Sequence, residues 1–99
     1  MSELACVANF KLETTVRPNS NRPYWLYVDA GERAYDRWKI DENIMHIRLS
    51  LRHEPFKFDY IRRWTTGGDK RFKRVVWHLF KFDKEEDRMF TVMTQFGGL

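Results

Sequence analysis

The stretch KRFKRVVWHLFKF, residues 70–82, is the part of the chain from which a fold can first be predicted. Its β-branched and aromatic residues favour a strand. A strand with water on one side alternates apolar and polar residues, and this stretch begins in that way before it becomes apolar at consecutive positions. We therefore expect it to be covered on both faces.

Short turn-forming segments divide the rest of the chain into further strand candidates. The connecting pieces DAGE, DEN, HEP, TTGGD and DKEED each carry Gly, Pro, Asp or Asn. Short connections make sequence neighbours pair in space, which predicts an antiparallel meander. The predicted strands are Leu4 to Glu13, Tyr24 to Val28, Arg33 to Ile40, Ile44 to Arg52, Phe56 to Trp64, Arg71 to Phe82 and Met89 to Phe96.

The predicted fold class is all-β, a single antiparallel meander of about six to seven strands rolled into a small sandwich or barrel. Residues 1–99 are assigned to one β domain, since this length leaves room for one core. Residues 14–23, TTVRPNSNRP, are predicted to be a loop. An alternative stays open for residues 29–40, because Asp29 and Glu32 have capping-box spacing and would begin a short helix. Gly31 and the aromatic residues favour a strand there.

Hairpin registers assign the side chains of these strands to the two faces of the sheet. A two-residue turn at Gly67 and Gly68 pairs Thr66 with Asp69 and carries the core face onward to Trp77 and Leu79. Most tryptophan and tyrosine side chains then fall on the core face, which favours packing over a ligand site for them.

Composition and cysteine usage narrow the class of protein. Eighteen Lys and Arg against fourteen Asp and Glu give a net charge of +4, which shifts expectation slightly toward a polyanionic partner. The lone Cys6 allows no internal disulfide, and no glycosylation sequon, signal peptide or bilayer-length apolar run occurs. The expected location is intracellular, in the cytoplasm or nucleus, and no membrane partner is expected.

A row of cations on adjacent predicted strands is the strongest surface feature. Such a basic sheet face would attract phosphates, and an aromatic ring among the cations would offer a base a stacking surface. The alternative is a solvated polar face that only keeps the chain soluble. The candidate nucleic-acid-binding residues are Arg33, Tyr35, Arg37, Lys39, His46, Arg48, Arg52, Lys57 and Arg63.

No catalytic or metal motif stands out in the sequence. The three histidines have no Cys or carboxylate at metal-ligand spacing, and no Ser or Cys lies in a nucleophile motif. We therefore expect no cofactor and no enzymatic activity. The first functional hypothesis is a non-enzymatic domain that binds RNA or DNA, or an acidic protein surface, through the basic sheet face.

A second hypothesis uses the aromatic outer face of the last two predicted strands. An apolar area of that kind is covered either by the segment from Leu4 to Leu12 or by a second molecule. In the latter case the chain is a small protein-interaction module or inhibitor, a class that includes viral and phage accessory proteins, or a homodimer. The candidate interface residues are Phe72, Val76, Phe80, Phe90 and Val92.

Overall fold

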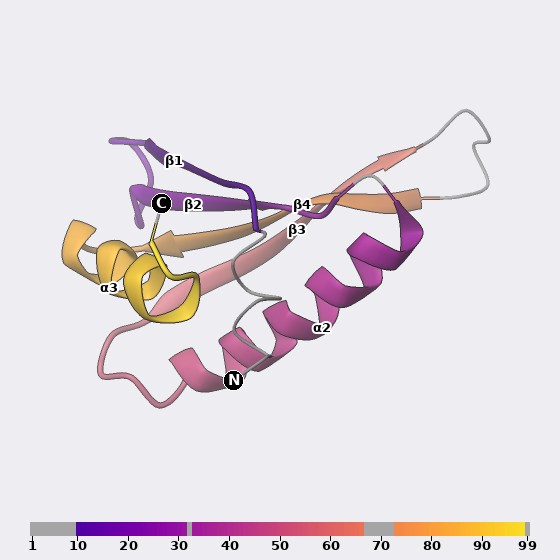
Figure 1. Cartoon of the computed structure of the whole chain (residues 1–99). Helices are drawn as coiled ribbons and strands as arrows, with labels where there is room; N and C mark the ends of the chain where they lie inside the picture. The colour runs from indigo at the N-terminus through magenta and orange to yellow at the C-terminus, as the bar shows by residue number, and fades with distance from the viewer. Residues whose placement is uncertain (1–9, 32, 67–72, 99) are drawn as a thin grey trace.

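The computed structural model describes residues 10–31, 33–66 and 73–98, which form an α+β fold of one four-stranded sheet and two helices. The elements are β1 (Leu12–Val16), β2 (Tyr24–Asp29), α2 (Ala34–Leu51), β3 (Phe58–Thr66), β4 (Lys73–Phe82) and α3 (Glu85–Gln95). Both helices lie on the same side of the sheet, below it in Figure 1. The prediction of an all-β meander with six to seven strands is therefore wrong.

The strands lie in the order β1-β2-β4-β3, and every neighbouring pair is antiparallel. Because β4 is antiparallel to both of its neighbours, β2 and β3 run parallel to each other with β4 between them. Parallel strands need a long crossover connection, and α2 supplies it. Strands that follow each other in sequence are thus not always neighbours in the sheet, contrary to a meander.

The core lies between the helices and the face of the sheet that they cover. From the sheet, Leu26, Phe80 and Phe82 are fully buried in it. Helix α2 contributes Ile44, Ile47 and Leu51, whose spacing of three and four residues places them on one side of a helix. Helix α3 contributes Val92, and Phe96, the residue that follows its last turn, is buried beside it in the core.

Strand β4 is apolar on both faces because it is a central strand. Phe80 points into the core, while Leu79 points to the opposite face, where its cross-strand neighbours are Tyr27 and Ile61. Leu79 is nevertheless only 1% exposed. The helices cover one face of β4, whereas no described helix or strand lies over the other face, where Leu79 sits between Tyr27 and Ile61 in the sheet.

Two predicted strands, Arg33 to Ile40 and Ile44 to Arg52, are wrong because residues 34–51 form the single helix α2. Apolar residues occur on two opposite sides of this helix. Ile47 faces the core, whereas Met45 is 57% exposed. Apolar residues on both sides weaken the 3.6-residue period, so the alternation from position 45 onward could be assigned equally to a strand.

The helical alternative for residues 29–40 is right from residue 34 onward, but the helix does not begin at Asp29. The N-cap residue is Arg33, which makes no side-chain cap hydrogen bond. Asp29 ends β2 instead, and its Oδ1 accepts a hydrogen bond of 2.8 Å from the Gly31 N–H. Gly31 has a φ of 83°, a backbone angle that L residues with side chains rarely adopt.

The last predicted strand, Met89 to Phe96, is also wrong, because residues 85–95 form helix α3. The acidic run that was assigned to a turn supplies Glu85, Glu86 and Asp87 to the first helical turn. Negative side chains at this position interact favourably with the positive end of the helix dipole. The same residues therefore begin a helix where a hairpin turn was expected.

The β3–β4 hairpin is present, but in a different register from the predicted one. Thr66 pairs with Lys73, and an irregularity at Arg63 and Trp64 shifts the register further, so that Tyr60 pairs with Phe80. This difference reverses the faces of β4. Phe80 and Phe82 lie under the helices, and Trp77 and Leu79 lie on the uncovered face.

The predicted N-terminal strand is described only in part. The predicted strand from Leu4 to Glu13 falls partly on residues 1–9, which lie outside the described residues, and β1 extends to Val16 into the predicted loop. Within residues 10–31, 33–66 and 73–98, neither helix is long and apolar enough to cross a membrane.

Candidate nucleic-acid interface

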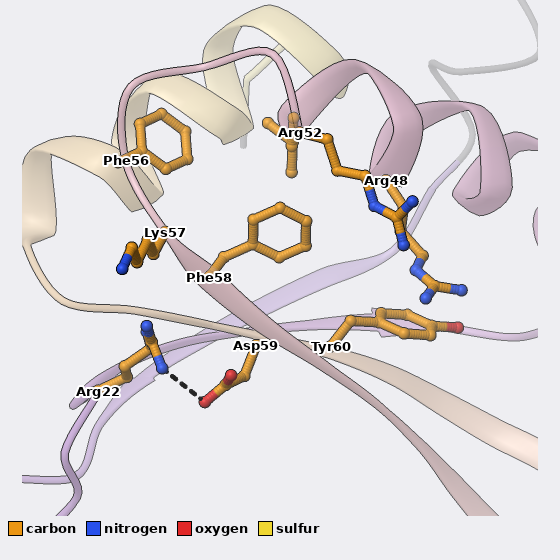
Figure 2. A pocket seen from close by; sticks show the side chains of 9 residues that line it. Arg22, Arg48, Arg52, Phe56, Lys57, Phe58, Asp59 and Tyr60 are labelled. Carbon is orange, nitrogen blue, oxygen red and sulfur yellow. Dashed lines mark hydrogen bonds and ion pairs between the residues drawn. The ribbon is translucent and has the colours of Figure 1, made fainter.

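A pocket of about 410 Å³ lies where the end of α2 meets the start of the edge strand β3. Helix α2 and the segment that follows it contribute Arg48, Leu51 and Arg52, and the loop before β2 contributes Arg22. We call this pocket the basic pocket, and Figure 2 shows it from close by. Its remaining lining residues are Phe56, Lys57, Phe58, Asp59 and Tyr60.

The pocket is positively charged because its cations outnumber its one carboxylate. Arg22 is neutralised, since its Nη1 lies 3.1 Å from Asp59 Oδ2 and its Nε lies 3.3 Å from Asp83 Oδ1. Arg48, Arg52 and Lys57 form no ion pair with a carboxylate in the described part of the chain. Three unneutralised cations around one pocket form a site for an anion.

Arg48 and Tyr60 are stacked at one wall of the pocket. The Arg48 Cζ lies 4.0 Å from the centre of the Tyr60 ring, a cation–π contact that places the guanidinium over the ring. In the view of Figure 2, Arg48 and Arg52 lie on one side of Phe58, and Arg22 and Lys57 lie on the other. A planar guanidinium held in this way is itself a surface on which a nucleobase can stack.

The hydroxyl of Tyr60 is held by a chain of polar groups behind the pocket. It lies 2.6 Å from His78 Nδ1, and the Arg62 Nε donates a hydrogen bond of 3.3 Å to it. The His78 Nε2 lies 2.9 Å from Asp41 Oδ1. Since a carboxylate attracts the Nε2 hydrogen, Nδ1 is free to accept the hydrogen of the Tyr60 hydroxyl.

Burial determines the protonation of these two groups. It raises the pKa of Tyr60 above its ordinary value of 10.0, which keeps the phenol protonated and able to donate. Burial also lowers the pKa of His78 below 6.5, because desolvation of the imidazolium outweighs the attraction of Asp41. The side chain of His78 is 1% exposed, so it positions Tyr60 and does not reach the pocket's solvent.

The structure brings three of the nine predicted nucleic-acid-binding residues together, namely Arg48, Arg52 and Lys57. Arg33 lies at the other end of α2 and forms an ion pair of 2.9 Å with Asp36. Arg63 lies on the uncovered face of the sheet, where its Cζ is 5.8 Å from the centre of the Tyr27 ring. The continuous basic sheet face predicted from sequence is therefore wrong, because most of its residues belong to a helix.

The other four predicted residues are distributed along α2. Tyr35 is 63% exposed, and Lys39 lies over the Trp38 ring with its Nζ 5.5 Å from the ring centre. His46 is exposed on the same helix, and Arg37 belongs to α2 as well. None of these four lines the basic pocket.

The predicted protein interface is divided in the same way. Phe80 and Val92 lie in the core, at 0% and 5% exposed, and Phe90 is 38% exposed on α3. The outer face on which these residues were expected does not exist, since residues 85–95 are helical and the faces of β4 are reversed. Phe72 and the side chain of Val76 lie outside what the structure describes.

Sequence reasoning missed Arg22, Phe58 and Tyr60 as members of the site. Arg22 lies in a predicted loop, 37 positions from the carboxylate that binds it, and nothing local links the two. Tyr60 was assigned to the core by its position in a strand. Its polar surroundings depend on Asp41 from α2 and His78 from β4, which come together only in the folded chain.

Comparisons with protein families, curated proteins and solved structures found no match for this chain.

Proposed function

We propose that this chain is a non-enzymatic protein that binds single-stranded nucleic acid, RNA or DNA, in the basic pocket. The observation that carries the proposal is that Arg48, Arg52 and Lys57 line one pocket without a carboxylate partner among the described residues. Cations placed in this way bind phosphates, which release their condensed counterions when neutralised.

The size and walls of the pocket support a single strand over a duplex. A volume of about 410 Å³ lies in the range of sites for small molecules and accommodates about one nucleotide, whereas a duplex is too wide to enter. The stacked Arg48 guanidinium supplies a flat surface to an unpaired base. Single-stranded nucleic acid exposes both the base face and the phosphates that such a site recognises.

The burial of His78 between Tyr60 and Asp41 supports binding over catalysis. A general acid or base has to reach the proton that it transfers, and His78 is 1% exposed. We assign it to positioning of Tyr60 under Arg48. An intracellular location accompanies this proposal, and the lone Cys6 supports it.

The proposal is tested by fluorescence anisotropy with labelled oligouridine and oligothymidine over a range of salt concentrations. Three phosphate contacts at about 0.7 each predict a slope of about −2 for log K against log[salt]. Replacing Arg52→Gln and Lys57→Gln together removes two contacts and reduces the slope to about −0.7. Lys84→Gln, an exposed cation outside the pocket, is the matched control and leaves the slope unchanged.

A duplex of the same length is expected to bind more weakly than either oligonucleotide. Absence of binding by both oligonucleotides at about 50 mM salt, where phosphate contacts are strong, contradicts the proposal. A loss for each charge removed that is the same in the pocket variant and in Lys84→Gln also contradicts it, because binding would then depend on net charge alone.

A further inference from the structure

Two arginines of the basic pocket lie one helical turn apart at the end of α2. Arg52 follows the last residue of the helix, and its N–H donates a hydrogen bond of 3.2 Å to the carbonyl oxygen of Arg48. Side chains at this spacing leave the same side of a helix, and in Figure 2 both lie on the same side of Phe58. Like charges four residues apart repel each other, so an anion between them is stabilising.

The other side of the pocket, across Phe58, carries no excess charge. Arg22 and Lys57 are the cations there. They are balanced by Asp59, which lines the pocket, and by Asp83, whose Oδ1 lies 3.3 Å from Arg22 Nε. The positive charge of the basic pocket is therefore concentrated at the two arginines of α2, which we call the arginine pair.

The charges around the arginine pair leave this excess in place. Asp41 keeps its charge beside the neutral His78, but the positive charge of Arg62 lies close enough to attract it. Glu54, in the loop after Arg52, does not line the pocket and pairs with no cation of the described chain. The negative end of the helix dipole favours both arginines, but it is equivalent to only about half an elementary charge.

A phosphate monoester matches the arginine pair better than a phosphodiester does. A phosphodiester inside a strand carries one negative charge, whereas a monoester carries about 1.5 to 2 at pH 7 and offers three acceptor oxygens. A guanidinium binds two such oxygens with parallel N–H groups. Arg48 is already placed over the Tyr60 ring, so it loses little side-chain freedom when it binds.

We propose that the arginine pair binds the phosphorylated end of a single strand, with the terminal nucleotide in the basic pocket. The monoester lies between Arg48 and Arg52, and the base packs against Phe58. Lys57 is left for the phosphodiester that joins the next nucleotide. This inference rests on the proposed nucleic-acid binding and names the part of the strand that the pocket recognises.

The test uses oligouridines of one length that end in a phosphate, a methyl-esterified phosphate or a hydroxyl. Each is made for the 5′ end and for the 3′ end, with the fluorophore at the opposite end. Fluorescence anisotropy with the full chain is expected to show that the phosphate at one end or both raises the affinity at least about tenfold over the hydroxyl. The methyl ester, which keeps the phosphate but carries one charge less, is expected to lose most of that gain.

Two variants separate the arginine pair from the rest of the pocket. Arg52→Gln is expected to reduce the ratio of the two affinities, phosphate over hydroxyl, to about twofold or less. Lys57→Gln is the matched control, because it is expected to weaken both oligonucleotides by the same factor and so to preserve the ratio. Arg52 and Lys57 are both exposed, so both variants are expected to fold, which circular dichroism checks.

Three outcomes count against this inference. Binding of the phosphate and hydroxyl ends with affinities within about twofold of each other overturns it and leaves the proposed function in place. A ratio that falls equally in Arg52→Gln and Lys57→Gln also overturns it, because the preference would then follow the net charge of the pocket. Absence of binding by every oligouridine contradicts the proposed function and this inference together.

Discussion

Replacing Phe80→Ala tests the arrangement of the core more directly than any other single substitution. Phe80 is 0% exposed, and its ring centre lies 5.2 Å from that of Tyr60 and 6.0 Å from that of Phe58. Truncation removes the buried ring and leaves a cavity under α2. Substitutions of this kind reduce the free energy of unfolding by about 3–5 kcal/mol.

A loss of that size is a large share of the stability of a small domain, which is about 5–15 kcal/mol. At about 4–8 °C for each kcal/mol, the unfolding midpoint is expected to fall by roughly 12–40 °C. Urea unfolding followed by tryptophan fluorescence and circular dichroism gives the difference in free energy by linear extrapolation.

The matched control is Phe90→Ala on α3, where the phenylalanine is 38% exposed and contacts Phe56. It is expected to cost about 1–2 kcal/mol, since a partly exposed ring leaves a smaller cavity. A loss below about 1 kcal/mol for Phe80→Ala refutes the assignment of this face of β4 to the core. That outcome would return Phe80 to an outer surface, where the sequence alone had put it.

Three further predictions concern the buried polar groups and one turn. The folded-state pKa of His78 lies below 6.5, so the unfolded chain binds the extra proton first and the stability that this residue contributes is lost as pH falls below about 6.5. Thermal unfolding between about pH 5 and 8 should therefore show a midpoint that depends less steeply on pH for His78→Gln than for the wild-type chain. Arg88→Ala should cost about 1–3 kcal/mol in urea unfolding, because the Arg88 Nη1 donates to the carbonyl oxygens of Thr15 at 2.8 Å and Trp25 at 3.3 Å. An unchanged free energy of unfolding for Arg88→Ala would contradict this role. Gly31→Ala should lower the free energy of unfolding by about 1–2 kcal/mol, because the φ of Gly31 is 83° and an added Cβ would lie 3.1 Å from the Asp36 Cβ. An unchanged unfolding midpoint would contradict the positive φ.

Strands β2, β3 and β4 could be predicted from the sequence, whereas the helices could not. Each of these strands is bounded by turn residues and rich in aromatic and β-branched residues. Helix α2 is apolar on two sides, with Ile47 buried and Met45 exposed. Its apolar residues therefore fit the two-residue alternation of a strand as well as the 3.6-residue period of a helix. In α3 the acidic residues that begin the helix are also typical turn residues.

The candidate site could be predicted only in part, for a related reason. The sequence identified Arg48, Arg52 and Lys57 as cations, but it assigned them to a sheet. Their common pocket depends on the end of α2 lying beside the start of β3. Arg22 and Tyr60 became members of the site through contacts with residues far away in the chain.

The sequence by itself determined which segments need burial, where turns interrupt the chain and that cations outnumber carboxylates. These properties follow from the residues one at a time or from their near neighbours. Tertiary structure alone decided the register of β3 against β4, the side of α2 that meets the sheet and the cations that share a pocket. Each of those outcomes depends on a competition between faces that are nearly equally apolar, and packing against the rest of the chain resolves it.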